Sequence, residues 1–244
     1  MGSKQFTVPD GVVEIECGTC YFGNGEKAAE IPKDISGVVI PDSVTAIGKD
    51  AFRGCSALTS VQIPGSVTEI GDGAFAGCTS LTSVNIPDSV MEIGNHAFYG
   101  CDSLTEIDIP DSVTEIGYSA FEDCTSLTSV VIPDSVSKIG DGAFWNCTSL
   151  TSVNIPDSVT YISWMAFCDC TSLTSLVIPN SVTKIGDSAF EGCTSLTSVN
   201  IPGSVTEIGS WAFVGCTFLE KVYAPKGLDL SDAGIPDSAE IIRR

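Results

Sequence analysis

Cysteines are the residues of this 244-residue sequence with the broadest capacity for chemistry, because thiols form disulfides, bind metals and act as nucleophiles. Eight of the eleven recur at a constant step of 23 residues. These eight are Cys55, Cys78, Cys101, Cys124, Cys147, Cys170, Cys193 and Cys216. No histidine or second thiol accompanies each copy, which argues against a metal site. Stacked copies of one position cannot all pair in disulfides, so we interpret the column as buried packing thiols.

Three cysteines fall outside this period. Cys17 and Cys20 form a C-x-x-C pair near the N-terminus, which could close as a disulfide or remain as two packing thiols. A lone C-x-x-C without a βαβ context is weak evidence for redox function. Cys168 occupies a variable position that we expect on an outward helical face, where it would be an exposed, reactive thiol.

Other catalytic constellations are not evident in the sequence. His96 is the single histidine, and no acid or nucleophile stands at a recognisable spacing from it. An aspartate followed by a serine stands after the periodic proline in several copies, and we interpret it as a turn-forming residue that hydrogen-bonds its own backbone. Ca²⁺ sites need several oxygen ligands close together, which one carboxylate per copy does not supply. We expect no catalytic residue, cofactor or metal, and no enzymatic activity.

The charge of the chain limits its partners. There are 31 acidic against 11 basic residues, which gives a formal net charge of −20. Such a chain repels phosphate backbones and anionic lipids, so nucleic-acid binding is not expected. No apolar run reaches the roughly 20 residues of a membrane span, so membrane insertion is not expected either.

A repeat of 23 residues must position all of these side chains. Proline recurs at this step, and cutting before each Ile-Pro gives eight units between residues 40 and 223 without an insertion or deletion. One unit alone buries too little apolar surface to fold, so we predict a solenoid of stacked units. Residues 1–39 contain a degenerate copy and residues 224–244 a compressed one, and we interpret these two segments as N-terminal and C-terminal caps.

The pattern changes within each unit. Ala51, Cys55 and Leu58 stand at i, i+4 and i+7, which predicts a short helical turn. Residues 58–63 alternate apolar and polar side chains, which predicts a half-buried strand that ends at Pro64. A turn and a short extended crossing then lead to the glycine of the next copy. The sequence therefore predicts an α/β repeat solenoid of strands and short helical turns.

The motif Cys-x-x-Leu-x-x-Val-x-Ile-Pro-x-Ser-Val-x-x-Ile-Gly-x-x-Ala-Phe resembles the BspA-like class of leucine-rich repeat. Copies run from Ile63-Pro64 to Gly215-Cys216. The resemblance implies a right-handed leucine-rich-repeat superhelix, with a parallel β-sheet on the concave face and the helical turns on the convex side. It also implies a bacterial cell-surface or secreted protein with a role in adhesion or host interaction. The chain itself shows no secretion signal or wall-sorting motif.

Positions that vary between copies do not hold the stack together, and two of them carry aromatic residues in consecutive units. We predict that these residues form an aromatic strip on the convex side: Tyr99, Tyr118, Trp145 and Trp164. Contiguous exposed aromatics are typical of contact hot spots. Drift of the repeat, with partly covered rings, is the alternative. A neighbouring column of glutamates, interrupted by Lys138, Tyr161 and Lys184, is interpreted as a solvated face.

The outward positions of the predicted sheet are the second candidate surface. They are mostly small and polar, and the variable ones are Asn85, Glu106, Asp108, Val131, Asn154, Val177 and Asn200. Leucine-rich repeats usually bind on this face, so the resemblance favours it, whereas residue chemistry favours the aromatic strip.

The sequence thus predicts a non-enzymatic module that binds a protein partner of the host, the matrix or the bacterial surface. Two alternatives stay open. One is a carbohydrate-binding module with Ser and Asn contacts and aromatic stacking. The other is a ligand-free structural scaffold, which includes a consensus-designed array.

Overall fold

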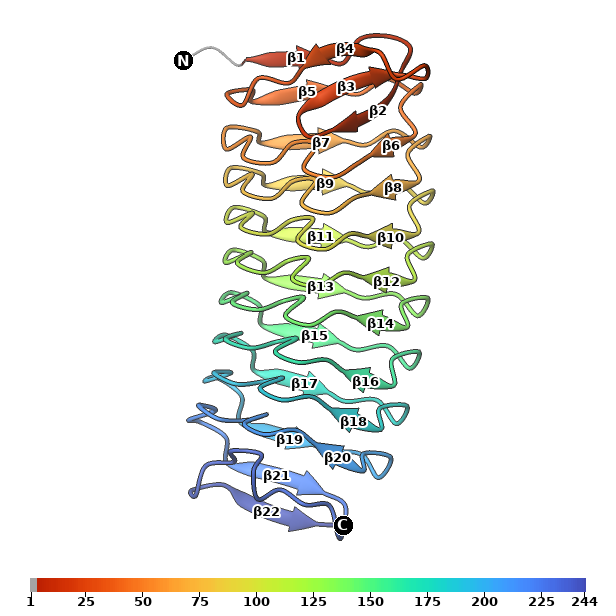
Figure 1. Cartoon of the computed structure of the whole chain (residues 1–244). Coiled ribbons are helices and arrows are strands. Elements are labelled where there is room, and N and C mark those ends of the chain that lie inside the picture. Colours follow the sequence, from red (N-terminus) through yellow and green to blue (C-terminus); the bar gives the residue numbers. More distant parts are fainter. Residues whose placement is uncertain (1–3) are drawn as a thin grey trace.

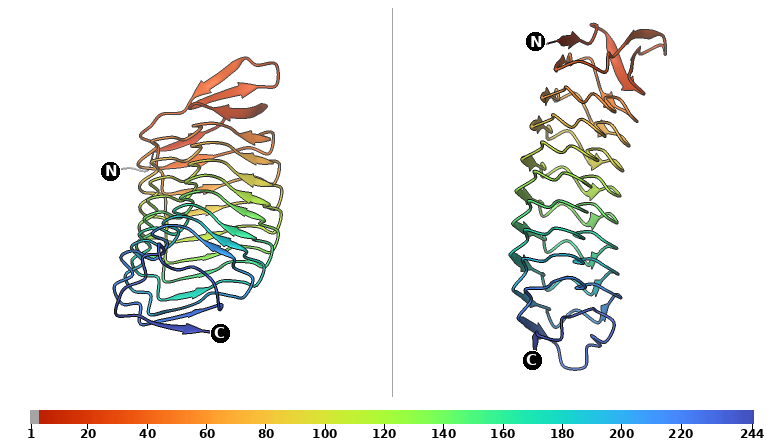
Figure 2. Two further views of the ribbon diagram at one scale, coloured as in Figure 1. Left: turned by 60° about the horizontal axis from the view of Figure 1, so that its bottom comes forward. Right: turned by 90° about the vertical axis from the view of Figure 1, so that its left-hand side faces the viewer.

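The computed structural model describes residues 4–244 as an elongated stack of coils (Figures 1 and 2). Each coil contributes one longer strand to one face and one short strand to the opposite face, as the side view in Figure 2 shows. Neighbouring coils pair in parallel with a step of 23 residues, so that Ser60 pairs with Ser83 and Val61 with Val84. The repeat period of the sequence is therefore the register of the sheet, and the expected parallel sheet is present.

Within residues 4–244, the long-strand face is built from eleven strands. They are β1 (Gln5–Thr7), β5 (Gly37–Val39), β7 (Ser60–Gln62), β9 (Ser83–Asn85), β11 (Glu106–Asp108), β13 (Ser129–Val131), β15 (Ser152–Asn154), β17 (Ser175–Val177), β19 (Ser198–Asn200), β21 (Lys221–Ala224) and β22 (Glu240–Arg243). The ladder is interrupted between β9 and β11 and between β17 and β19. All its pairings are parallel, which suits strands that each follow one full turn of the coil.

Nine strands of the described part of the chain build the short-strand face. They are β2 (Val12–Glu16), β6 (Ala46–Ile47), β8 (Glu69–Ile70), β10 (Glu92–Ile93), β12 (Glu115–Ile116), β14 (Lys138–Ile139), β16 (Tyr161–Ile162), β18 (Lys184–Ile185) and β20 (Glu207–Ile208). At the N-terminal end β2 also begins an antiparallel extension, with β3 (Thr19–Phe22) and β4 (Lys27–Glu30). The ladder stops at β14 and resumes at β16, so one step in the stack differs from the others.

The expected helical turns are absent from residues 4–244, and this part of the fold prediction was wrong. Successive backbone N–H groups around Phe52 alternate between two kinds of partner. Ala51 and Cys55 donate to the carbonyl three residues earlier, whereas Phe52 and Gly54 donate to carbonyls of the next coil at 2.7 Å. A helix would need all of these donors within its own turn. The solenoid is therefore a β-solenoid of strands and successive tight turns.

Backbone conformation explains why no helix forms there. Asp50 and Gly54 have positive φ angles of 52° and 71°, and equivalent residues in most other copies also have positive φ. Left-handed residues cannot continue a right-handed helix. The column of Gly54 contains only Gly, Asp and Asn, the residues that tolerate this conformation best. That composition was the signal in the sequence against a helix.

The core is a set of apolar columns that run through the stack. Eight phenylalanines from Phe52 to Phe213 are fully buried, and neighbouring rings stack with centroids 5.2–5.7 Å apart. The periodic cysteines lie beside them. Each thiol from Cys78 to Cys216 donates to the carbonyl oxygen of a phenylalanine in the preceding coil, as in Cys78 to Phe52 at 3.3 Å. A buried thiol column with satisfied donors is thus part of the packing.

Serine and threonine side chains connect the coils. Six serines that follow the periodic proline donate to a valine carbonyl of the preceding coil, as Ser112 does to Val90 at 2.6 Å. Threonines form further columns of the same kind, such as Thr82 to Thr59 at 3.0 Å. The turn after the proline is closed by the backbone, where the N–H of Val67 donates to the carbonyl of Pro64.

Candidate binding surfaces

The long-strand face presents the predicted sheet residues to solvent. The middle residue of each three-residue strand from β7 to β19 points into the core, and the two flanking residues are exposed. Asp108, Val131, Asn154 and Val177 are consecutive ladder partners and therefore form one row across four strands. Asn85 lies on β9, and Glu106 begins β11. Two valines stand out in this polar row, since Val131 is 66% exposed and Val177 is 61% exposed.

A groove lies along one edge of this row, at the end of the long strands where the chain turns at the periodic proline. Its volume is about 710 Å³. Asn154, Val177 and Asn200 line it together with the proline turns of the same coils, among them Pro179 and Asn180. The structure thus brings three of the predicted sheet residues into one concavity. Amide groups alternate there with apolar proline and valine surface, which suits a partner with both polar and apolar groups.

The C-terminal residue closes one end of the groove. The Arg244 guanidinium lies over the Tyr223 ring, 4.0 Å from its centroid, and donates to Asn200 Oδ1 at 3.5 Å. At the other end lie the carboxylates of Asp134 and Asp157. The groove therefore has a positive and a negative end. Sequence reasoning missed Arg244, because it lies in the irregular last 21 residues, where the repeat assigns no position to it.

The aromatic strip lies in the tight turns that replace the expected helices. Tyr118 and Trp164 are exposed, with 42% and 39% of their surface accessible, whereas Tyr99 and Trp145 are half-buried. His96 brings two members together, because its ring makes edge contacts with Tyr118 at 4.8 Å and with Tyr99 at 6.0 Å. The helical argument that grouped these residues was wrong, but the 23-residue step places them in consecutive turns.

Acidic residues hold the two half-buried aromatics. Trp145 Nε1 donates to Asp169 Oδ2 at 3.4 Å. The nearby charge of Asp123 is the main cause that raises the pKa of Tyr99. The Tyr99 hydroxyl therefore stays protonated and donates to the Asp123 carboxylate. These two rings are thus anchored to the turn of the following coil, and Tyr118 and Trp164 offer more free ring surface.

The cysteines outside the period differ in their exposure. Cys168 is buried, so the expectation of an exposed, reactive thiol was wrong; its burial, with Asp169 beside it, raises the pKa to about 12. The thiol lies outside the core cluster and donates to Asp169 Oδ2 at 3.7 Å. Cys17 is exposed, Cys20 is buried in β3, and both are free thiols in the structure. Burial raises the pKa of Cys20 to about 11.

Within residues 4–244, no three His, Cys, Asp or Glu side chains gather closely enough to hold a metal ion. The same residues contain no helix with the length and apolarity needed to cross a membrane.

Comparisons with known proteins agree with this architecture. A family model described as "BspA type Leucine rich repeat region" matches residues 28–151 and 137–234, with six copies. The chain is similar to a leucine-rich repeat protein of T. pallidum, at 31% identity and a TM-score of 0.65, over 92% of this chain and 95% of that one. It is also similar to a leucine-rich cell surface protein of Faecalibacterium prausnitzii, at 33% identity and a TM-score of 0.58, over 90% of this chain and 59% of that one.

A further structure shows the same fold at lower identity. The pneumococcal vaccine antigen PcpA is 17% identical, with a TM-score of 0.58, over 99% of this chain and 78% of that one. No curated protein matches the chain. None of these similarities points to an enzymatic family.

Proposed function

Since the chain belongs to the family of BspA-type leucine-rich repeat proteins, we propose that it is a non-enzymatic module of a bacterial cell-surface or secreted protein that binds a protein partner on its long-strand face. Leucine-rich repeat proteins in general bind proteins. The cell-surface description of the F. prausnitzii protein supports the proposed location. Adhesion to a host or matrix protein is the biological role that fits this location.

The observation that carries the proposal is the groove beside Asn154, Val177 and Asn200. Exposed valines on a sheet that is otherwise lined by Ser and Asn give a partner apolar surface to cover, and the amides around them give direction to hydrogen bonds. Neighbouring coils are hydrogen-bonded through their turns even where the long-strand ladder is interrupted, as Thr206 N–H is to the Thr183 carbonyl at 2.9 Å. A partner would therefore meet a preformed surface and lose little free energy to ordering this chain.

A photo-crosslinking experiment tests this proposal. A photoreactive amino acid is placed at position 177 and, in a second protein, at position 91, because Met91 is an apolar residue 56% exposed beside the short strands. Both proteins are incubated with host extracellular-matrix proteins and irradiated. We expect a crosslinked protein from position 177 that excess unlabelled chain displaces, and none from position 91. Equal crosslinking from both positions, or glycan-array binding without any protein crosslink, would contradict the proposal.

A further inference from the structure

The short-strand face carries a second depression, which the function proposed above does not use. Two hollows of about 570 and 310 Å³ adjoin there and share Asp72, Glu92 and Gly94. Together they form a continuous channel that runs along the stack, across the strands, from the coil of β2 to the coil of β16. We call this channel the acidic trough.

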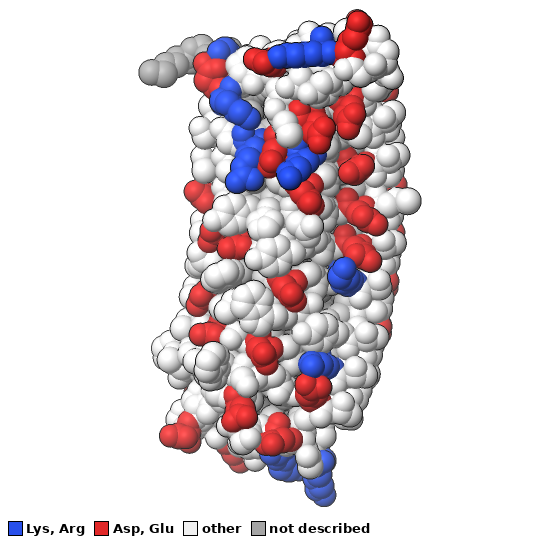
Figure 3. All heavy atoms as spheres, viewed as in Figure 1, with Lys and Arg blue, Asp and Glu red and all other residues white. Residues whose placement is uncertain are grey.

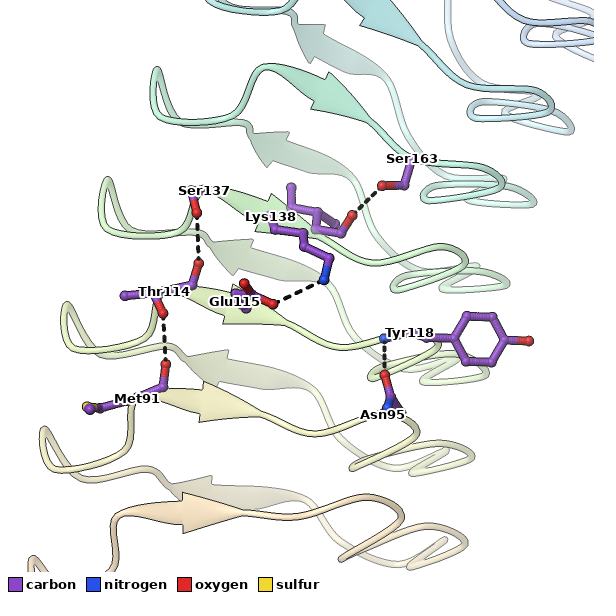
Figure 4. A network of polar contacts seen from close by, with 9 residues as sticks. Met91, Asn95, Thr114, Glu115, Tyr118, Ser137, Lys138 and Ser163 are labelled. Carbon is purple, nitrogen blue, oxygen red and sulfur yellow. Dashed lines mark hydrogen bonds and ion pairs between the residues drawn. The ribbon is translucent and has the colours of Figure 1, made fainter.

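The trough has two walls of side chains and a floor of backbone. One wall consists of the first residues of the short strands, such as Glu92 and Glu115, and the other of the residues that follow the periodic glycine, such as Asp72, Asn95 and Tyr118. Figure 4 shows Glu115 and Tyr118 at the two ends of one such crossing. The floor glycines are already bonded, since the N–H of Gly117 donates to the Ile93 carbonyl at 2.8 Å. A ligand would therefore be recognised by the walls and not by added strand pairing.

Negative charge dominates the walls. The two hollows are lined by seven acidic residues, namely Glu14, Glu16, Glu69, Asp72, Glu92, Glu115 and Asp141, and by only two lysines, Lys49 and Lys138. Lys138 is already paired with Glu115 at 3.1 Å. Within residues 4–244, Glu69 and Glu92 have no ion-pair partner. Figure 3 shows the resulting row of acidic side chains down this face, interrupted by basic ones.

Aromatic rings and a change in the stack mark the end of the trough at the coil of β16. Ser163 stands where the other copies have glycine, and its hydroxyl donates to the Ile139 carbonyl at 2.5 Å, which in other copies accepts from the glycine N–H. The ladder is broken at this step, between β14 and β16. Tyr161 and Tyr118 line the trough near this break.

The chain's own lysines show what these walls can hold. Lys184 lies outside the trough, one coil beyond Tyr161. Its ammonium is 5.9 Å from the centroid of the Tyr161 ring and 2.7 Å from Glu207. A tyrosine face combined with a carboxylate is a recognised site for a lysine or arginine side chain. Tyr118 and Glu92 also line the trough, and within residues 4–244 Glu92 has no ion pair and Tyr118 no cation–π contact with a lysine.

We propose that the acidic trough binds an extended, lysine- and arginine-rich segment of a protein partner. From Glu14 to Tyr161 the short-strand column makes six steps of about 4.8 Å, roughly 29 Å in total, which matches about nine extended residues at ~3.3 Å each. Basic side chains on one side of such a segment recur every ~6.6 Å, and their flexible stems reach carboxylates in the coils from β8 to β14, while the terminal one stacks on Tyr161. An extended basic segment matches both the elongated shape and the negative charge of the channel. An anionic partner would be repelled, and a bulky folded surface would not match the elongated shape.

This inference rests on the proposed role as a binding module but concerns the opposite face. Its test does not involve the groove at Val177, so either proposal can fail alone. The probe is a fluorescently labelled nine-residue peptide of alternating lysine and glycine, and its binding to the full chain is measured by fluorescence anisotropy at physiological salt. An alternating glutamate and glycine peptide is the negative control.

Two charge-matched variants separate the trough from the general negative field of the protein. The trough variant combines Glu69→Gln, Glu92→Gln and Asp141→Asn. The control variant combines Asp42→Asn, Asp88→Asn and Asp111→Asn, which removes the same charge from exposed turns outside both binding surfaces. We expect the trough variant to weaken peptide binding at least tenfold and the control variant less than twofold. Equal losses would overturn the proposal, because they would show binding to the overall charge.

A second pair of variants tests the aromatic contribution. Tyr161→Leu should weaken binding several-fold, and Tyr161→Phe should retain the affinity, since the ring face and not the hydroxyl holds the cation. Equal affinity of both variants with the parent would contradict the stacking role. Full displacement of the peptide by spermine at the same charge concentration would show that the trough holds any polycation and would overturn the assignment to a protein segment.

Discussion

Neighbouring coils approach each other closely at the periodic glycines. Adding one methyl group there should therefore lower the free energy of unfolding strongly. A Cβ built on Gly117 would lie 2.6 Å from the Gly94 carbonyl carbon and 2.7 Å from the Asn95 nitrogen. Ordinary contact begins at 3.4 Å, so in Gly117→Ala these two coils must separate by about 0.8 Å, the difference of 3.4 and 2.6 Å. The obstacle is the backbone of the preceding coil, which cannot rotate away as a side chain can.

The cost follows from two contributions. Overpacking of a tight interior costs about 1–3 kcal/mol. Separation also lengthens ladder bonds such as Gly117 N–H to Ile93 O, now 2.8 Å, and each weakened bond costs about 1 kcal/mol. We therefore expect Gly117→Ala to lower the free energy of unfolding by about 3 kcal/mol. For a chain of this length that corresponds to a Tm lower by roughly 6–12 °C.

Thermal unfolding followed by circular dichroism at 217 nm measures this effect. Gly65→Ala is the matched control, because nothing lies within 4 Å of its added Cβ and its φ is not positive. That variant should unfold within about 2 °C of the parent, since the methyl group meets only solvent. A Gly117→Ala protein as stable as the parent, or equal losses in both variants, would refute the close-packed coil geometry.

Four further predictions follow from the same contacts. Ser163→Gly should raise Tm by roughly 2–4 °C, because a backbone N–H can again bond the Ile139 carbonyl and restore the ladder between β14 and β16; an unchanged or lower Tm would contradict this role of Ser163. In the reduced native protein at pH 8, a thiol-specific chromogenic reagent should label only Cys17, whereas denaturant should expose all eleven thiols; rapid labelling of several native thiols would show that the column is not buried. Burial raises the pKa of Cys78 and Cys216 to about 12 from an ordinary value of about 9. Above pH 9 the unfolded chain therefore loses thiol protons that the native chain keeps. The free energy of unfolding should then fall by up to ~1.4 kcal/mol per pH unit for each such thiol. Urea unfolding between pH 8 and 11 checks this sign, which a flat profile would contradict. Trp145→Ala with Trp164→Ala should weaken partner binding while the fold stays intact; unchanged affinity would remove the aromatic strip from the binding surface.

The period, the register and the core columns could be predicted from the sequence, because the repeat carries no insertion and the same positions are apolar in every copy. The helix prediction failed for a physical reason. Ala51, Cys55 and Leu58 point inward in both a helix and a row of tight turns, so their spacing does not separate the two. The discriminating signal was the Gly, Asp and Asn column at residue 54, which marks positive φ.

The binding surfaces were only partly predictable. Asn154, Val177 and Asn200 lie in one groove because the 23-residue step aligns them, and the sequence shows that step. Arg244 and Tyr223 meet only because the irregular C-terminal segment folds back onto β21, which no repeat position indicates. The trough was missed because its glutamates were interpreted one column at a time, and the channel arises between two columns.

The most direct test of the binding face is the affinity of the partner captured at position 177 for two arginine variants. Val177→Arg places charge in the groove of the long-strand face, and Met91→Arg places the same charge at an equally apolar site beside the short strands. We predict at least a tenfold loss of affinity, about 1.4 kcal/mol, for Val177→Arg and less than a twofold change for Met91→Arg. Equal losses, or a larger loss for Met91→Arg, would contradict binding on the long-strand face.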